Sequence, residues 1–102
     1  MKEKISITDG VNYSKGSIVS KQIINKKTGT VTLFAFDKGQ SLSEHTAPFD
    51  AMAQVTDGTA TVIIGGEPHK VKTGEMIIMP ANITHAVKAD VKFKMLLTMV
   101  RG

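Results

Sequence analysis

Two of the three histidines in this chain, His45 and His85, are the side chains best suited by type and position to chemistry. An imidazole changes its charge near neutral pH, and it can donate a proton, accept one or ligate a metal. Strand alternation places His45 on the same face as Ala47, and it places His85 on the face opposite Lys88. Because a lysine marks the solvent side, we expect His85 to point inward. The residues alone leave two interpretations open: a two-histidine site, or two histidines without a chemical role.

The segments that must position these histidines have the pattern of short strands. Apolar and polar residues alternate with a period of two, and glycine, proline, asparagine and aspartate interrupt the alternation. We expect strands over residues 18–24, 30–37, 41–46, 52–56, 59–64, 67–72, 75–79, 84–89 and 91–100. No segment of ten or more residues has a helical period. Many short strands with closely spaced turns predict an all-β sandwich or barrel.

One turn and one strand support more specific predictions. The dipeptide Asp57-Gly58 lies between two apolar runs. It predicts a tight hairpin, because it supplies the positive φ angles that such a turn needs. The strand over 30–37 is mostly apolar on both faces, which predicts burial on both sides, one of them by a second subunit. We therefore expect a homodimer.

Length and composition limit the classes of function. The chain has 102 residues, which fits a single domain over 1–102, and it has no cysteine for a disulfide or a thiolate ligand. Its net charge is +4, but aromatic residues make up only 5%, and Arg101 is the single arginine, which disfavours nucleic acid as a partner. No apolar run reaches the ~20 residues of a membrane helix. We expect a cytoplasmic protein that binds neither nucleic acid nor membrane.

Two segments have the spacing of a known family. The first covers 39–58 and the second covers 74–89. The positions that carry the spacing are Gly39, His45, Gly58, Gly74, Pro80 and His85. The two segments resemble the paired motifs of the cupin superfamily, and the interval between them is typical of short single-domain cupins. The resemblance implies a double-stranded β-helix, or jelly-roll barrel, of antiparallel strands.

The same resemblance implies a reduced metal site. In metal-dependent cupins, three histidines and one glutamate hold a divalent ion. By the resemblance, His45 and His85 match two of these ligands and face one cavity. Ala47 and Ala51 stand where the other histidine and the glutamate are found. Two of four ligands remain, so a stable ion is not expected from these positions alone.

Residues near the motifs add candidates of lower rank. Asp50 and Gln54 are the candidates for a third metal ligand, although neither is in phase with the lost glutamate position. Phe49 lies near the expected cavity mouth and is the aromatic residue best placed to contact a ligand. We expect His69 to be exposed and without a role. Five methionines either line the cavity as an adaptable apolar surface or fill the core: Met52, Met76, Met79, Met95 and Met99.

Two functions are consistent with these observations. The first is a small-molecule-binding cupin whose pocket contains His45, Ala47, Phe49, Ala51 and His85, with the histidines in contact with a polar or anionic group. The second is a metal-dependent cupin enzyme, an isomerase or a dioxygenase-like catalyst, with the two histidines as ligands. The loss of two ligands favours the first. The sequence predicts no cofactor with certainty. A weakly bound divalent metal ion is the one cofactor that it leaves open.

Overall fold

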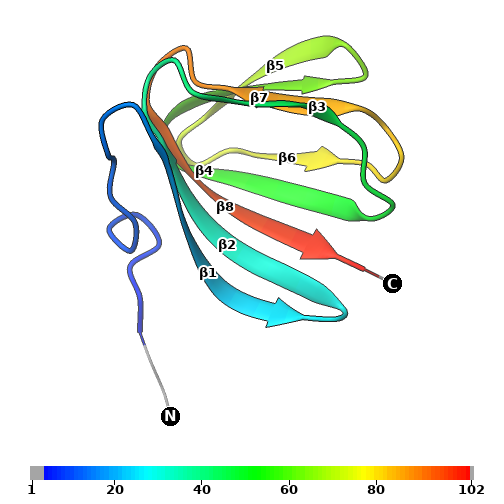
Figure 1. The fold of residues 1–102 in the computed structure, drawn as a ribbon, viewed down its shortest axis with the longest axis horizontal. Coiled ribbons are helices and arrows are strands. Elements are labelled where there is room, and N and C mark those ends of the chain that lie inside the picture. The colour runs from blue at the N-terminus through cyan, green and yellow to red at the C-terminus, as the bar shows by residue number, and fades with distance from the viewer. Residues whose placement is uncertain (1–3, 102) are drawn as a thin grey trace.

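The computed structural model describes residues 4–101, and these residues contain eight strands in two facing antiparallel sheets (Figure 1). The strands are β1 (Ile18–Lys26), β2 (Gly29–Phe36), β3 (Ser41–His45), β4 (Asp50–Ile64), β5 (Glu67–Lys72), β6 (Met76–Met79), β7 (His85–Lys88) and β8 (Phe93–Val100). Between residues 4 and 101 there is no helix with the length and apolar character needed to cross a membrane. The prediction of an all-β fold is confirmed.

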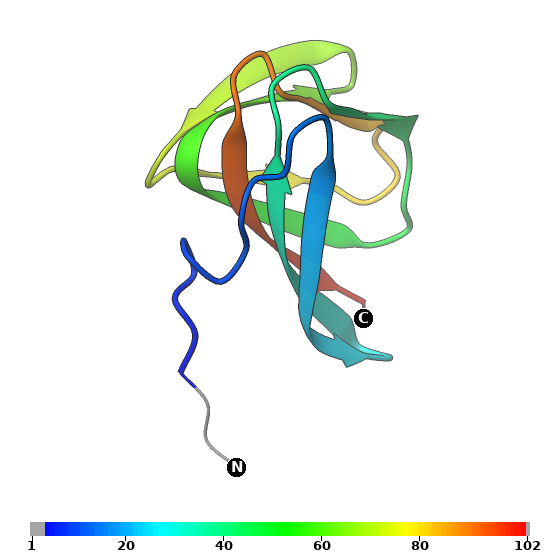
Figure 2. The same ribbon diagram turned by 60° about the vertical axis from the view of Figure 1, so that its left-hand side comes forward.

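The longest strand, β4, joins the two sheets. One sheet has the order β1-β2-β8-β4-β6, and the other has the order β3-β7-β4-β5, with every pair antiparallel. The first half of β4 pairs with β6 and β8, and its second half pairs with β5 and β7. Figures 1 and 2 show this strand curling from one sheet into the other. The result is the antiparallel jelly-roll barrel that the resemblance implies.

The predicted hairpin at Asp57-Gly58 is wrong, because β4 continues through this dipeptide without reversing. Gly58 has a φ of 74°, but it turns the strand from one sheet toward the other. A bulge in the pairing with β8 precedes it and adds to the twist. A Cβ at this position would lie 2.3 Å from the carbonyl oxygen of Lys92. Both the positive φ and the close approach of β8 therefore require glycine, and the dipeptide marks a corner of the barrel.

The barrel interior is held by aromatic and aliphatic side chains from both sheets. Phe36 and Phe93 are fully buried and stack with ring centroids 4.6 Å apart. Burial of one such side chain contributes about 1.5–3 kcal/mol to stability. This interior is occupied at one end by the aromatic pair, and at the other end it opens into the cavity described below.

A second apolar cluster lies outside the barrel, where the N-terminal segment crosses β2. Val11 and Tyr13 pack with Leu33 and Ala35, whose side chains point away from the interior. The Tyr13 hydroxyl donates a 2.6 Å hydrogen bond to the Asp57 carboxylate, which fixes the segment in place. At these two positions of β2, the second apolar face is covered by the chain's own N-terminal segment and not, as the sequence suggested, by another subunit.

Candidate functional site

The pairing of β3 with β7 brings the two histidines together. His45 is the last residue of β3, His85 is the first residue of β7, and the two are register partners. Their Nε2 atoms lie 3.1 Å apart, and their ring planes meet at 69°. Two residues that are distant in the sequence thus present their ring nitrogens to the same point.

Each imidazole is oriented by a backbone carbonyl of its own segment. Nδ1 of His45 lies 2.8 Å from the Ser43 carbonyl oxygen, and Nδ1 of His85 lies 3.3 Å from that of Ile83. Because a carbonyl only accepts, these contacts assign the ring proton to Nδ1 in both residues. The two Nε2 lone pairs then face each other and repel. A proton on either Nε2, or another electron-pair acceptor, removes this repulsion.

The two histidines differ in their exposure to solvent. His85 is buried, with 7% of its surface exposed, whereas His45 is exposed at the mouth of the site. Desolvation lowers the pKa of His85, and the charge of a protonated His45 lowers it further. The hydrogen bond to Ile83 acts in the opposite direction and is the weaker influence. The pKa of His85 therefore lies below its ordinary value of 6.5, so its neutral form dominates at pH 7.

The histidine pair forms the polar end of a cavity of about 170 Å³. The other lining residues are apolar and come from β3, β4, β6, β7, β8 and the loop before β4: Leu42, Ala47, Phe49, Ala51, Met79, Val87, Met95, Leu97 and Met99. The five pocket residues expected from the sequence, His45, Ala47, Phe49, Ala51 and His85, lie around this one cavity. None of its lining residues within 4–101 is acidic.

The described residues do not fit the four-ligand metal site that the resemblance implies. Within residues 4–101, no group of three or more His, Cys, Asp or Glu side chains is arranged to hold an ion. Asp50 accepts a hydrogen bond from the Ala81 amide, and Gln54 lines a different hollow. The Nε2 separation is close to the roughly 3.3 Å expected for two imidazoles on one tetrahedral ion. Ala47 and Ala51 offer no further donor, however, and stable sites need three or four.

Some features of the cavity could not be read from the sequence. Arg101 lies over the Phe49 ring, with its guanidinium carbon 5.1 Å from the ring centroid. This cation–π contact holds an aromatic side chain of the cavity wall. The two residues meet because β4 pairs with β8, which places Asp50 opposite Val100. The only hint in the sequence is that Arg101 is the single arginine of the chain.

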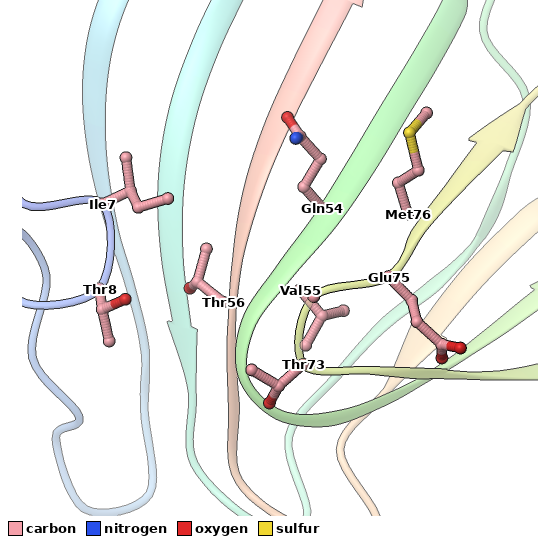
Figure 3. A pocket seen from close by; sticks show the side chains of 9 residues that line it. Ile7, Thr8, Gln54, Val55, Thr56, Thr73, Glu75 and Met76 are labelled. Atoms are coloured by element: carbon pink, nitrogen blue, oxygen red, sulfur yellow. The ribbon is translucent and has the colours of Figure 1, made fainter.

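The remaining candidates lie elsewhere. His69 is on β5, opposite Val62, and it is half-buried, where the sequence suggested exposure. Of the methionines, Met79, Met95 and Met99 line the cavity, whereas Met52 and Met76 do not. A larger hollow, about 310 Å³, lies outside the barrel and is lined by no histidine (Figure 3). The chemistry-bearing residues are therefore concentrated in the smaller cavity.

Comparisons with known proteins agree with this fold. A family model described as "Cupin domain" matches residues 32–101. A conserved protein of unknown function from Streptococcus pyogenes is similar over 100% of this chain and 90% of its own, with 32% identity and a TM-score of 0.94. A Cupin 2 conserved barrel domain protein from Leptotrichia buccalis is 46% identical, with a TM-score of 0.87. That alignment covers 89% of this chain but only 44% of the Leptotrichia chain.

More distant structures share the fold alone. A variant of salicylate 1,2-dioxygenase from Pseudoaminobacter salicylatoxidans in complex with gentisate has a TM-score of 0.75 and 17% identity. The match covers 81% of this chain and 25% of the dioxygenase chain. Among curated proteins, none matches this chain. These similarities therefore establish the fold of the chain. Its ligand has to be inferred from the residues of the site.

Proposed function

The chain belongs to the cupin domain family, and on that premise we propose that it is a small-molecule-binding cupin whose ligand is a small acid with an apolar body. The acid group lies against His45 and His85, and the apolar body occupies the 170 Å³ cavity. One observation carries the proposal: two Nε2 atoms 3.1 Å apart converge at one end of an otherwise apolar cavity.

The size of the cavity limits the ligand. An apolar cavity of roughly 150 Å³ accommodates benzene in another protein. At about 170 Å³, this cavity has room for one ring or a short branched chain beside the acid group. Three methionines in its wall, Met79, Met95 and Met99, have flexible, polarizable side chains that adapt to the shape of a ligand. A benzoate-sized carboxylate is therefore the ligand class that fits.

The charge of the site favours an acid that binds together with a proton. His85 is mainly neutral in the free protein, because burial lowers its pKa. A carboxylate beside the pair stabilises the imidazolium form and opposes the repulsion between the two rings. Proton uptake then accompanies binding, so the affinity for an acid increases as the pH falls from neutral. A neutral analogue of the same shape gains nothing from this change.

Aromatic acids are the first probes to use. A structural neighbour, salicylate 1,2-dioxygenase, is described in complex with gentisate, and both names denote aromatic carboxylates. That protein shares only the fold with this chain, so its ligand serves as a starting point for a screen. Benzoate, salicylate, gentisate and isobutyrate cover the size range of the cavity, and benzamide is the neutral control.

The experiment is a calorimetric titration of each probe at pH 5.5 and pH 7.5. We expect at least one acid to bind, more tightly at the lower pH, while benzamide does not. His85→Ala should weaken this acid at least about tenfold, because a charge-assisted hydrogen bond is worth roughly 1.5–3 kcal/mol. The matched control is His69→Ala, which removes a half-buried histidine that does not line the cavity.

A second variant tests the apolar part of the site. Ala51→Leu adds three carbon atoms to the cavity wall and leaves both histidines in the chain. It should exclude the benzoate-sized acids while leaving inorganic anions at the histidine pair unaffected. Failure of every acid to shift the imidazole NMR signals of His45 and His85 would overturn the proposal.

Metal-dependent catalysis, with His45 and His85 as ligands of an isomerase or dioxygenase-like centre, is the second candidate. The Nε2 separation favours it, because two imidazoles on one ion lie at about this distance. The alanines at 47 and 51 count against it, since they leave the ion with too few protein ligands. Metal analysis of protein purified without chelator is the test. One ion per chain retained through dialysis would reverse the order of the two candidates.

A further inference from the structure

Two pairs of side chains lie at the open end of the barrel, one from each sheet. His45 and His85 come from the paired strands β3 and β7, whereas Phe49 and Arg101 lie at the neighbouring ends of β4 and β8. Figure 1 shows the C-terminal end of β8 at the same end of the barrel as the β3–β4 and β6–β7 loops. Both histidines and Phe49 line the same cavity. Arg101 is therefore close to the acid site proposed above, on the other side of its opening.

Strand alternation and register explain why Arg101 meets Phe49. Every second residue at the end of β8 lines the cavity up to Met99, and Arg101 is the next in this series. On β4, Ala51 is the register partner of Met99, and Phe49 is two residues before it. The backbone of Arg101 is held by a 2.8 Å hydrogen bond from its amide to the Thr28 carbonyl oxygen. Arg101 thus continues the inner row of β8 at the rim of the cavity.

The guanidinium of Arg101 is a permanent positive charge at this rim, because it does not lose its proton in the physiological range. It is exposed, and its carbon lies 5.1 Å from the centroid of the Phe49 ring. Among residues 4–101, no carboxylate lies within ion-pair distance of it. A cation–π contact at an exposed site is weak, and a guanidinium binds a carboxylate more strongly, through two parallel N–H···O bonds.

The charge balance of the site limits what the ligand carries. When a carboxylate binds at the histidine pair and one proton is taken up there, the two charges cancel. The charge of Arg101 then has no counterpart, since none of the described cavity-lining residues is acidic. A second carboxylate on the ligand would supply that counterpart. It would have to lie at the mouth, because the rest of the cavity wall is apolar and offers a buried charge no partner.

We propose that Arg101 is a specificity-determining residue, and that the ligand is a small diacid with both carboxylates at one end of a short apolar body. This inference rests on the proposed function. The first carboxylate lies against His45 and His85, and the second binds the guanidinium of Arg101, which gives up its contact with Phe49. The apolar body occupies the cavity, with the Phe49 ring remaining part of the wall.

The first test compares acids that have the same apolar body and one or two carboxylates. Isovalerate is matched with isopropylmalonate, and benzoate with phthalate, by calorimetric titration at pH 7 and low salt. We expect each diacid to bind about three- to tenfold more tightly than its monoacid, a gain limited by the exposure of the rim. Terephthalate, whose second carboxylate is at the opposite end of the ring, should not bind, because that group would enter the apolar part of the cavity.

The second test removes the guanidinium. Arg101→Gln should reduce the affinity of each diacid to about that of its monoacid, and should change the monoacid less than about twofold. Arg101→Lys keeps the charge without the planar fork and should retain part of the preference for the diacid. Lys21→Gln is the matched control, because it lowers the net charge by the same amount at an exposed position of β1 that does not line the cavity. Salt at 0.3 M should reduce the preference, since the rim is open to solvent.

The outcomes separate this inference from the proposed function. If no monoacid or diacid shifts the imidazole NMR signals of His45 and His85, both are overturned. If monoacids bind but the diacids bind no more tightly, or if Arg101→Gln leaves the preference unchanged, only the role of Arg101 is overturned. Equal weakening of monoacid and diacid by Arg101→Gln also overturns it, because the residue would then act through Phe49 and not on a second carboxylate.

Discussion

Strand β8 separates two apolar regions that differ in what they can bind. On its inner side, Met95, Leu97 and Met99 form part of a cavity that ends at two histidines. On its outer side, Leu96 lies beside Leu33, and Thr98 lies between Val31 and Met52. Both regions are mostly apolar, so apolar character alone does not define a ligand site. What distinguishes the inner region is enclosure on several sides together with two convergent polar atoms.

The largest effect that separates the two regions is on stability. Phe36→Ala removes a fully buried ring that stacks on Phe93, and it should lower the free energy of unfolding by about 3–5 kcal/mol. Ile78→Ala on the outer face, where the side chain is half exposed, should cost less than about 1 kcal/mol at low protein concentration. Urea unfolding measures both. Equal losses would mean that the outer face contributes to the fold of the single chain as much as the interior does.

The next effect is a gain of metal affinity in the inner region alone. Ala47 and Ala51 line the same cavity as the two histidines. Ala47→His combined with Ala51→Glu supplies four converging donors, and divalent metal should bind at least about tenfold more tightly than to the natural chain. Calorimetry with Zn²⁺ and Mn²⁺ measures the change, and each single variant serves as a three-ligand control. No gain in the double variant would show that the cavity does not bring these positions together around one point.

A smaller effect should come from the attachment of the N-terminal segment. The Tyr13 hydroxyl donates to Asp57, and burial followed by this carboxylate raises the pKa of the phenol well above its usual value. Tyr13→Phe removes the hydrogen bond and should cost about 1 kcal/mol of unfolding free energy. The segment should also become more sensitive to protease, while acid binding in the cavity is unchanged. Ser14→Ala, at an exposed neighbour, is the control.

The smallest effect is a pH dependence specific to His85. Its pKa in the folded chain lies below the ordinary 6.5, so the unfolded chain binds its proton first as the pH falls. The free energy of unfolding should therefore decrease as the pH drops below about 6.5, and this group should contribute no slope at higher pH. Replacement by glutamine should remove this part of the pH dependence, and a bound acid should reduce it. A wild-type profile that is identical to that of His85→Gln contradicts the assignment.

Much of the fold follows from local patterns in the sequence. Period-two alternation locates strands near their observed positions, because each strand buries one face against the interior. Asp57-Gly58 shows where this reasoning fails. The same positive φ serves a hairpin or a corner, and only the distant contact with Lys92 decides between them. Pairing partners as far apart as Asp50 and Val100 cannot be derived from short-range patterns.

The sequence predicts the histidines of the candidate site better than it predicts the apolar residues that line the rest of the cavity. Alternation and motif spacing single out His45 and His85, which the structure places in contact. Leu42 and Val87 complete the cavity only because β3 and β7 pair in one register, which the sequence does not specify. The sequence predicts a second subunit over the strand that contains Leu33 and Ala35, whereas the structure covers these two residues with the N-terminal segment, which has no strand pattern. The segment is held on the sheet by the hydrogen bond from Tyr13 to Asp57, two residues that are 44 positions apart in the sequence.

The path of β4 through both sheets has a consequence for how the chain folds. Because this strand pairs with β5, β6, β7 and β8, neither sheet can be completed before it is in place. Most of these partners follow it at long range along the chain, and distant pairing slows folding to milliseconds or seconds in all-β domains. We expect one slow, single-exponential refolding phase in which both sheets gain hydrogen-exchange protection together. The amides of β4 should then exchange only through global unfolding.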